Sequence, residues 1–189
     1  MKVLVTYATR HGATGGIAQR IAQTLERSGL EVALEPVEEA SEPALYDAFV
    51  IGSAAYAGHW LKEASAFVRD HCDLLASRPV WLFSSGPTGT ARVDDKGRDV
   101  FEAARPAEFG EFQAHIKPRA EKVFFGAYDP DAEPTNVAER FFKGFMKVMP
   151  SVRDSLPSGD FREWPEIEAW AEQIAAELLP VPVTGATRG

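Results

Sequence analysis

The amino-acid sequence predicts an α/β domain built on a doubly wound parallel sheet with helices on both faces. Short apolar runs that suit buried strands alternate along the chain with longer segments whose apolar residues recur every three or four positions. Each helical crossover carries the chain back across the sheet to the end at which the strands begin, so we expect parallel strands. The length of 189 residues suits one domain, which we place at residues 1–179, with a flexible tail at residues 180–189.

The first strand and the first helix have the clearest signals. The run from Val3 to Val5 predicts a buried strand that ends near Tyr7. From Thr14 onward, small and apolar residues keep the spacing of an amphipathic helix, which we expect to stop near Gly29. The same alternation predicts strands at residues 31–35, 48–52, 80–84 and 122–127, and helices at residues 61–75 and from residue 164 onward.

Two segments are longer than the usual connection between a strand and a helix. Residues 86–119 and 128–160 are interpreted as insertions that carry specificity. Within the second insertion, residues 136–149 predict a helix with three phenylalanines and two methionines along it. Two interpretations of this helix stay open: its aromatic side packs on the sheet, or it meets a quinone or a membrane interface, helped by Lys143 and Lys147.

Charge and cysteine content exclude several classes of function. The formal net charge of −8 argues against a nucleic acid as the main partner, because binding a polyanion relies on clustered lysine and arginine. Cys72 is the only cysteine, which leaves no intramolecular disulfide and no thiolate-rich metal site. No run approaches the roughly 20 apolar residues of a transmembrane helix. We expect a cytoplasmic protein without a metal, and peripheral contact with the inner face of the membrane is compatible with the sequence.

Ligands of doubly wound sheets bind at the carboxyl ends of the strands, so three loops are candidate sites. The first combines hydroxyls, a glycine and backbone amides at the start of a helix, which favours a phosphate dianion. The alternative is a turn that only caps the helix. The loop has neither the Gly-Lys-Ser/Thr ending of a Walker loop nor the GxGxxG pattern of dinucleotide sites. Its candidate binding residues are Thr9, Arg10, His11, Gly12, Ala13 and Thr14.

The second and third loops supply aromatic and small polar residues. In the second loop, aromatic side chains would flank a planar isoalloxazine ring, whereas the alternative for Trp60 is that it begins the next helix and packs on the sheet. In the third loop, hydroxyls would hydrogen-bond the pyrimidine edge of a flavin, or the segment is a solvated turn. The candidate residues are Ser53, Ala54, Ala55, Tyr56, Gly58 and Trp60 in the second loop, and Ser84, Ser85, Gly86 and Thr88 in the third.

Three segments resemble the phosphate, middle and third loops of the flavodoxin family: VLVTYATRHGAT, YDAFVIGSAAYAGHW and PVWLFSSGP. The resemblance implies a flavodoxin-like five-stranded sheet in the order 2-1-3-4-5 and flavin mononucleotide (FMN) as cofactor. His11 stands where the family signature has its middle threonine, so one phosphate hydroxyl is lost or exchanged for an imidazole donor. The segments FFGAYDP, ERFFKGFMKVM and SGDFREWPEIEAWAEQIA extend the resemblance to the menaquinone-dependent protoporphyrinogen oxidase branch.

Three functions stay open at this point. The branch resemblance implies an oxidoreductase with a quinone acceptor, for which His59 is the candidate catalytic group that shuttles a proton; the alternative is a histidine satisfied within its loop. The acidic charge supports a second function, an electron carrier between protein partners without a small-molecule substrate of its own. A flavodoxin fold that has lost flavin and serves an interaction role is the third, favoured if His11 blocks the phosphate.

Overall fold

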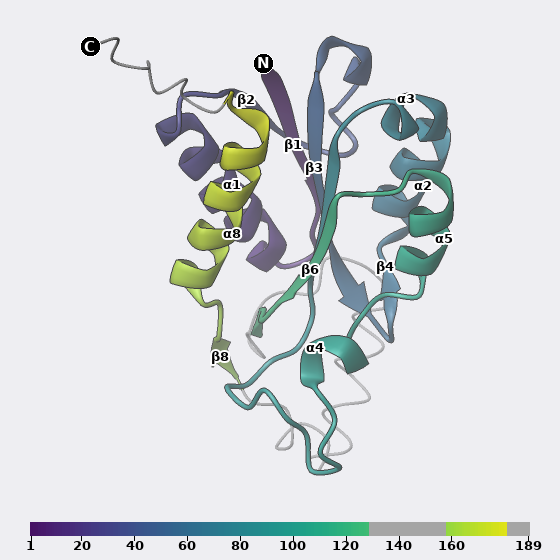
Figure 1. The fold of residues 1–189 in the computed structure, drawn as a ribbon. Helices are drawn as coiled ribbons and strands as arrows, with labels where there is room; N and C mark the ends of the chain where they lie inside the picture. Colours follow the sequence, from purple (N-terminus) through teal and green to yellow (C-terminus); the bar gives the residue numbers. More distant parts are fainter. Residues whose placement is uncertain (129–157, 181–189) are drawn as a thin grey trace, which may run out of the picture.

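The computed structural model describes residues 1–128 and 158–180. Among these residues, five parallel strands form the central sheet in the order β2-β1-β3-β5-β6 (Figure 1). Counted among these five strands alone, this is the order 2-1-3-4-5, so the predicted doubly wound sheet is confirmed. The strands are β1 (Lys2–Ala8), β2 (Glu31–Pro36), β3 (Ala48–Tyr56), β5 (Val80–Ser85) and β6 (Ala120–Phe124).

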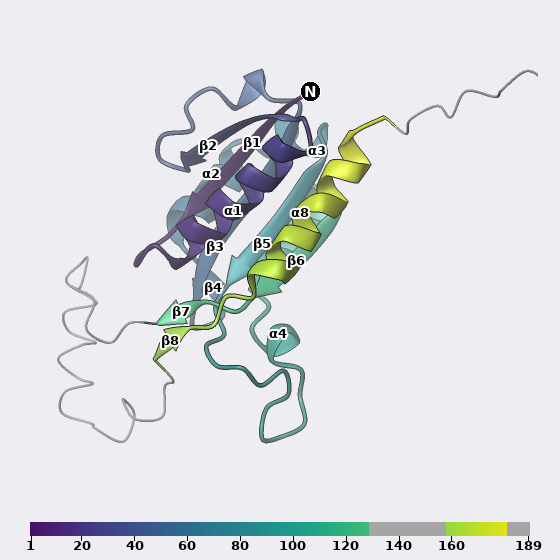
Figure 2. The same ribbon diagram turned by 90° about the vertical axis from the view of Figure 1, so that its left-hand side faces the viewer.

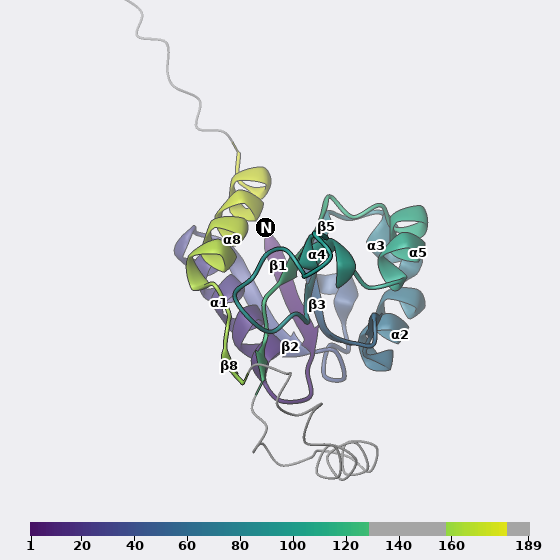
Figure 3. The ribbon, with the colours of Figure 1, turned by 90° about the horizontal axis from the view of Figure 1, so that it is seen from below.

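Helices cover both faces of the sheet, as Figures 1 and 3 show. One layer holds α1 (Ala13–Arg27) and α8 (Trp164–Leu178), which lie side by side. The other layer holds α2 (Lys62–Asp70), α3 (Cys72–Ala76) and α5 (Glu108–His115). The short helix α4 (Val100–Ala103) lies beyond the carboxyl ends of the strands, and a single 3-10 turn, η1 (Pro43–Leu45), precedes β3.

A separate apolar core fills the space on each side of the sheet. Side chains alternate along β1, so that Val3 and Val5 pack with α1 and α8, whereas Leu4 packs with α2 and α5. The ring of Phe83 in β5 is fully buried on the α1 side. Gly52 in β3 leaves the space for that ring, because a Cβ atom at Gly52 would collide with it. The sheet is therefore held from both faces. The end of the sheet formed by the carboxyl ends of its parallel strands, called the carboxyl edge below, is a rigid base for loops.

The structure departs from the predicted elements after β3. The strand expected at residues 48–52 continues to Tyr56 and turns back as β4 (His59–Trp60), which pairs with β3 in antiparallel fashion. Trp60 therefore lies in a hairpin and does not begin a helix. The helix expected at residues 61–75 is interrupted at His71, whose φ of −111° is not helical, and so forms α2 and α3. The strand predicted at residues 122–127 is β6, which ends at Phe124; two residues further on, Gly126 N donates to Pro87 O in the third loop.

The two predicted insertions differ in how much of them is described. Residues 86–119 contain α4, α5 and an antiparallel bridge between Val93 and Asp99. The helix predicted at residues 136–149 and the tail beyond residue 180 lie outside the described residues. At the borders of the second insertion, β7 (Ala127–Tyr128) and β8 (Gly159–Asp160) pair in a ribbon below the carboxyl edge of the sheet (Figure 2). None of the described helices is long and apolar enough to cross a membrane.

Candidate functional site

The first loop presents the start of α1 at the carboxyl edge. Gly12 is the N-cap of the helix and has a φ of 81°, a conformation that glycine adopts without strain. Its amide donates to Thr9 Oγ1 at 3.1 Å, which closes the loop on itself. Among the described residues, no side chain caps α1. Within the described part of the chain, α1 thus begins without a side-chain cap for its first amides, an arrangement that favours an anion.

A buried hydrogen bond joins the first loop to the third. Thr14 Oγ1 and Ser85 Oγ lie 2.7 Å apart, and the exposed fractions of the two residues are 0% and 4%. Thr14 belongs to the first turn of α1, and Ser85 ends β5. From the sequence, Thr14 is expected at the phosphate and Ser85 at the pyrimidine edge of a flavin. In the structure the two hydroxyls bond to each other and fix the start of α1 against the sheet.

The second loop is a tight hairpin held by α5. Ala57 and Gly58 both have positive φ, 50° and 79°, which is the conformation of a two-residue turn between antiparallel strands. Gly58 O accepts a hydrogen bond from Ala107 N at 2.9 Å. Alanine is strained at positive φ, so contacts from outside the hairpin must stabilise this turn.

Glu108 supplies two of these contacts. Its Oε1 lies 3.0 Å from His59 Nδ1, and its Oε2 accepts from Trp60 N at 3.1 Å. The side chain of Glu108 is 12% exposed, whereas that of His59 is 65% exposed. The sequence did not single out Glu108, because nothing in residues 86–119 marks which side chain reaches the second loop. The contact orients the His59 ring through Nδ1, while most of the side chain stays exposed.

Trp60 packs in the core between the sheet and α5. It is 4% exposed, and its ring lies 5.2 Å from Phe109 and 5.5 Å from Phe112, measured between centroids. Its Nε1 atom is buried without a hydrogen-bond partner among the described residues. The structure thus bears out the packing part of the alternative for Trp60, whereas its start of the next helix is wrong, because Trp60 lies in β4. Tyr56, on the same hairpin, is 48% exposed.

Two of the candidate serines support the backbone of the edge. Ser53 is fully buried, and its hydroxyl accepts from Leu61 N at 3.1 Å and donates to Ala54 O. The Ser84 hydroxyl donates to Ser53 O at 3.3 Å. These contacts tie β3 to β5 and to the start of α2. Ser53 and Ser84 therefore shape the site from below, and Ala55 pairs with Trp60 in the hairpin.

The remaining candidate residues belong to the first and third loops. His11 and Gly86 are exposed, and Thr88 is half-buried. Arg10 extends toward α2, where its Nη2 atom lies 3.8 Å from Glu63 Oε1. In all, hydrogen bonds join the third loop to the first, through Thr14 and Ser85, and to the second, through Ser84 and Ser53, and α5 holds the hairpin of the second loop.

Arg162 reaches the first loop from a distant part of the sequence. Its Nη1 atom donates to Ala13 O at 3.2 Å, across 149 positions of the chain. Asp160 holds the same guanidinium through Nε at 2.7 Å and Nη2 at 2.6 Å. These hydrogen bonds lower the pKa of the Asp160 carboxyl. Sequence reasoning missed Arg162, although it lies in a segment, SGDFREWP, that the resemblance had included.

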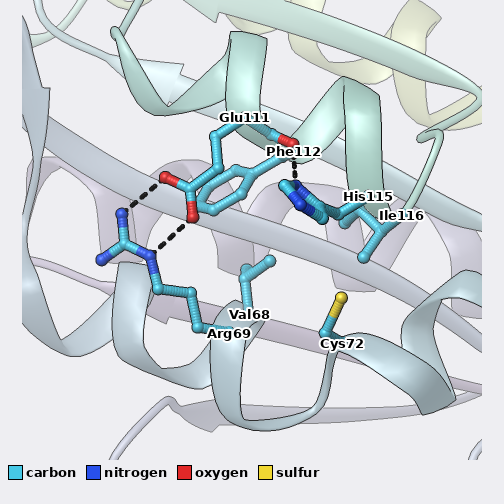
Figure 4. A pocket seen from close by; sticks show the side chains of 7 residues that line it. All are labelled: Val68, Arg69, Cys72, Glu111, Phe112, His115 and Ile116. Atoms are coloured by element: carbon cyan, nitrogen blue, oxygen red, sulfur yellow. Dashed lines mark hydrogen bonds and ion pairs between the residues drawn. The ribbon is translucent and has the colours of Figure 1, made fainter.

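A cavity of about 210 Å³ lies elsewhere, between the C-terminal turns of α2 and α5 (Figure 4). Arg69 and Glu111 line it and form a bidentate ion pair with two contacts of 2.7 Å, which lowers the pKa of Glu111. Cys72 and His115 also line it, and His115 Nδ1 hydrogen-bonds Glu111 O. The two charged groups of this cavity, Arg69 and Glu111, are engaged with each other, so the candidate site remains the carboxyl edge. The described residues contain no cluster of side chains suited to a metal ion.

A five-stranded parallel sheet in this order, with helices on both faces, defines a doubly wound α/β domain of the flavodoxin-like type. Residues 4–135 match the family model described as Flavodoxin domain, and the chain belongs to this family. Flavodoxins share the fold: a flavodoxin from the domain Archaea has a TM-score of 0.57 at 14% identity, with 94% of this chain and 99% of that chain covered. The flavodoxin of Streptococcus pneumonia TIGR4 has a TM-score of 0.54 at 17% identity, with 94% of this chain and 99% of that chain covered.

A curated relative points to a narrower group. The protoporphyrinogen IX dehydrogenase [quinone] of Escherichia coli (strain K12) is 34% identical over 86 residues, which cover 44% of this chain and 48% of that protein. The match therefore spans about half the length of the relative. The flavodoxin-like class and its similarity to the protoporphyrinogen oxidase branch, both expected from the sequence, are confirmed at this level.

Proposed function

We propose that the protein binds FMN at the carboxyl edge of its sheet and acts as an oxidoreductase with a quinone acceptor. The observation that carries the proposal is the start of α1, a helical turn without a side-chain cap among the described residues, in a chain of the Flavodoxin domain family. Amides at such a turn, together with the helix dipole, favour a dianionic phosphate. The phosphate is the part of FMN that the first loop would hold.

Thr9 and Thr14 would serve the phosphate in different ways. Thr9 Oγ1 already accepts from Gly12 N, so its hydroxyl hydrogen stays available to donate to a bound anion. Thr14 is fully buried and bonded to Ser85, so it fixes the position of the loop. His11, exposed at the loop tip, would offer an imidazole donor in place of a hydroxyl. The donor set therefore fits a phosphate.

The hairpin of the second loop would face the ring of the cofactor. Tyr56 is the exposed aromatic side chain of this loop, whereas Trp60 is held in the core. His59 would exchange a proton at Nε2, because its Nδ1 is fixed by Glu108. FMN supplies one- and two-electron redox chemistry when bound, and the chain supplies orientation and electrostatics. The catalytic role of His59 is part of this proposal.

The substrate class follows from the named relative. We propose a protoporphyrinogen-like reductant and a quinone acceptor, since the relative carries these two in its name and shares 34% identity with this chain over 86 residues. Within residues 86–119, α4 and its flanking loops lie beyond the carboxyl ends of the strands (Figure 1), where they would add a surface for a substrate or a quinone. Peripheral contact with a membrane would bring a quinone within reach of this surface.

An electron carrier between protein partners is the second candidate function. The net charge of −8 favours it, because an acidic surface steers association with basic partner proteins. The two candidates share the cofactor and differ in the substrate. Anaerobic reduction of the bound flavin by protoporphyrinogen, followed by reoxidation with a menaquinone analogue, separates them. If neither reaction occurs, the oxidoreductase proposal is wrong and the carrier function becomes the first candidate.

FMN binding is tested by fluorescence titration of the full chain. We expect Thr9→Ala to weaken FMN binding by about tenfold, which corresponds to the loss of about 1.4 kcal/mol of hydrogen bonding. Thr14→Ala should weaken it by a similar factor, because the first loop loses the contact with Ser85 that fixes its position. Thr24→Ala is the matched control, because Thr24 is a buried threonine of the same helix, α1, whose hydroxyl bonds Arg20 O. No FMN binding by the unaltered chain would refute the proposal and favour an interaction role.

A further inference from the structure

Arg162 places a cationic group against the first turn of α1. Its Nη1 atom faces the helix and donates to Ala13 O at 3.2 Å, whereas Nε and Nη2 face Asp160. The side of the guanidinium that faces α1, at Nη1, is therefore not the side that binds the Asp160 carboxylate. The side chain of Arg162 is only 17% exposed, so water screens this charge less than it screens a surface arginine.

Gly16 makes the space for this guanidinium. A Cβ atom at position 16 would collide with Nη1 of Arg162, although Gly16 lies inside a helix, where glycine costs about 1 kcal/mol relative to alanine. The obstructing atom is the far end of a flexible side chain, so an alanine at this position displaces the guanidinium and leaves the backbone in place. Glycine, a poorer helix former than alanine, therefore occupies the position in α1 at which Arg162 contacts the helix.

Two further contacts orient Arg162. Its guanidinium lies over the ring of Trp164, 4.5 Å from the centroid. The strand β8, which contains Asp160, is paired with β7, and Phe161 N donates to Gly126 O at 3.1 Å. Figure 2 shows this ribbon below the end of the sheet at which α1 begins. Arg162 is therefore held at the first loop by structure on both sides of it in the sequence.

We propose that Arg162 is a specificity-determining residue that makes the site select a phosphorylated flavin over the same flavin without its phosphate. The Arg162–Asp160 ion pair turns its positive side, at Nη1, toward the first turn of α1, and this orientation adds to the field of the helix N-terminus and lowers the energy of a dianion there. It has no comparable effect on a neutral ribityl chain. This inference rests on the proposed FMN site and names the side chain that gives that site its preference for FMN over riboflavin.

Arg20 provides a matched control. Its guanidinium also lies over Trp164, 4.9 Å from the ring centroid, and it forms an ion pair with Glu168 at 2.8 Å. Arg20 follows Ala13 by seven positions of α1, which places it about 10 Å further along the helix axis. Removing Arg20 therefore removes the same charge and a similar ring contact at a greater distance from the first turn.

The experiment measures dissociation constants of FMN and riboflavin by fluorescence titration of the full chain and of Arg162→Gln, Gly16→Ala and Arg20→Gln. We expect the first two variants to reduce the preference for FMN over riboflavin by about three- to tenfold, and Arg20→Gln to change it by less than about twofold. The effect of Arg162→Gln should decrease as salt is added. Gly16→Ala should keep or raise the midpoint of thermal unfolding, because alanine favours the helix.

The two proposals fail in different ways. If the unaltered chain binds FMN and both test variants keep its preference over riboflavin, the role of Arg162 is refuted and the FMN site stands. An equal loss of both flavins would also refute it, because a merely structural role moves both constants together. If the unaltered chain binds neither flavin, the proposed function fails, and this inference fails with it.

Discussion

The hydrogen bond between Thr14 and Ser85 makes a quantitative prediction about stability without any ligand. Thr14→Val keeps the shape of the side chain and removes its hydroxyl, which leaves Ser85 Oγ buried and without its 2.7 Å partner. An unsatisfied buried hydroxyl costs about 1–3 kcal/mol. Ser85→Ala should have a cost of the same order for the same reason. The double variant leaves neither hydroxyl unsatisfied, so it should be less unstable than the sum of the two single variants.

The expected coupling between the two positions is about 1 kcal/mol or more, of the sign that makes the double variant more stable than additivity predicts. Urea unfolding of the four proteins measures it, since each free energy of unfolding follows from the midpoint and slope of the transition. In thermal unfolding, each 1 kcal/mol corresponds to about 2–4 °C for a chain of this size. If the two single effects add within about 0.3 kcal/mol, the hydroxyls of Thr14 and Ser85 do not stabilise each other. The hydrogen bond between the first and third loops would then contribute nothing to stability, and the reasoning would be refuted.

Two further predictions concern the core and the acid limit of stability. Gly52→Ala should destabilise the protein by about 1–3 kcal/mol, because its Cβ collides with Phe83, whereas Gly110→Ala, with nothing in its way, should stabilise α5 by about 0.5–1 kcal/mol; thermal unfolding of both variants checks this pair. The pKa of Asp160 is lowered by its hydrogen bonds with Arg162, so its contribution to stability is present above the unfolded value of about 3.9 and is lost as pH falls through the folded value. In Asp160→Asn, the free energy of unfolding should therefore fall less steeply as pH is lowered through that range. An unchanged dependence on pH would show that the hydrogen bonds between Asp160 and Arg162 do not lower this pKa.

The sheet was predictable because its signals are local. Short apolar runs gave the five parallel strands, and the need for right-handed crossovers gave their direction. The hairpin at Ala57 was not predictable in the same way. Alanine rarely adopts a φ of 50°, and the turn depends on Ala107 and Glu108, which come about fifty positions later. A local pattern cannot specify such a turn, because the contacts that stabilise it form only in the folded chain.

The candidate site shows the same limit. The first loop was predictable from its hydroxyls and glycine, since those residue types act through their own backbone. Its partners were not, because Ser85 lies 71 positions away from Thr14 and Arg162 lies 149 positions from Ala13. Gly16 is the one local sign of the second contact: a glycine inside an amphipathic helix indicates a close approach, but it does not name the side chain that approaches. The sequence therefore indicates a close approach at the first turn of α1, beside the proposed phosphate site, and only the fold shows that the approaching group is the guanidinium of Arg162.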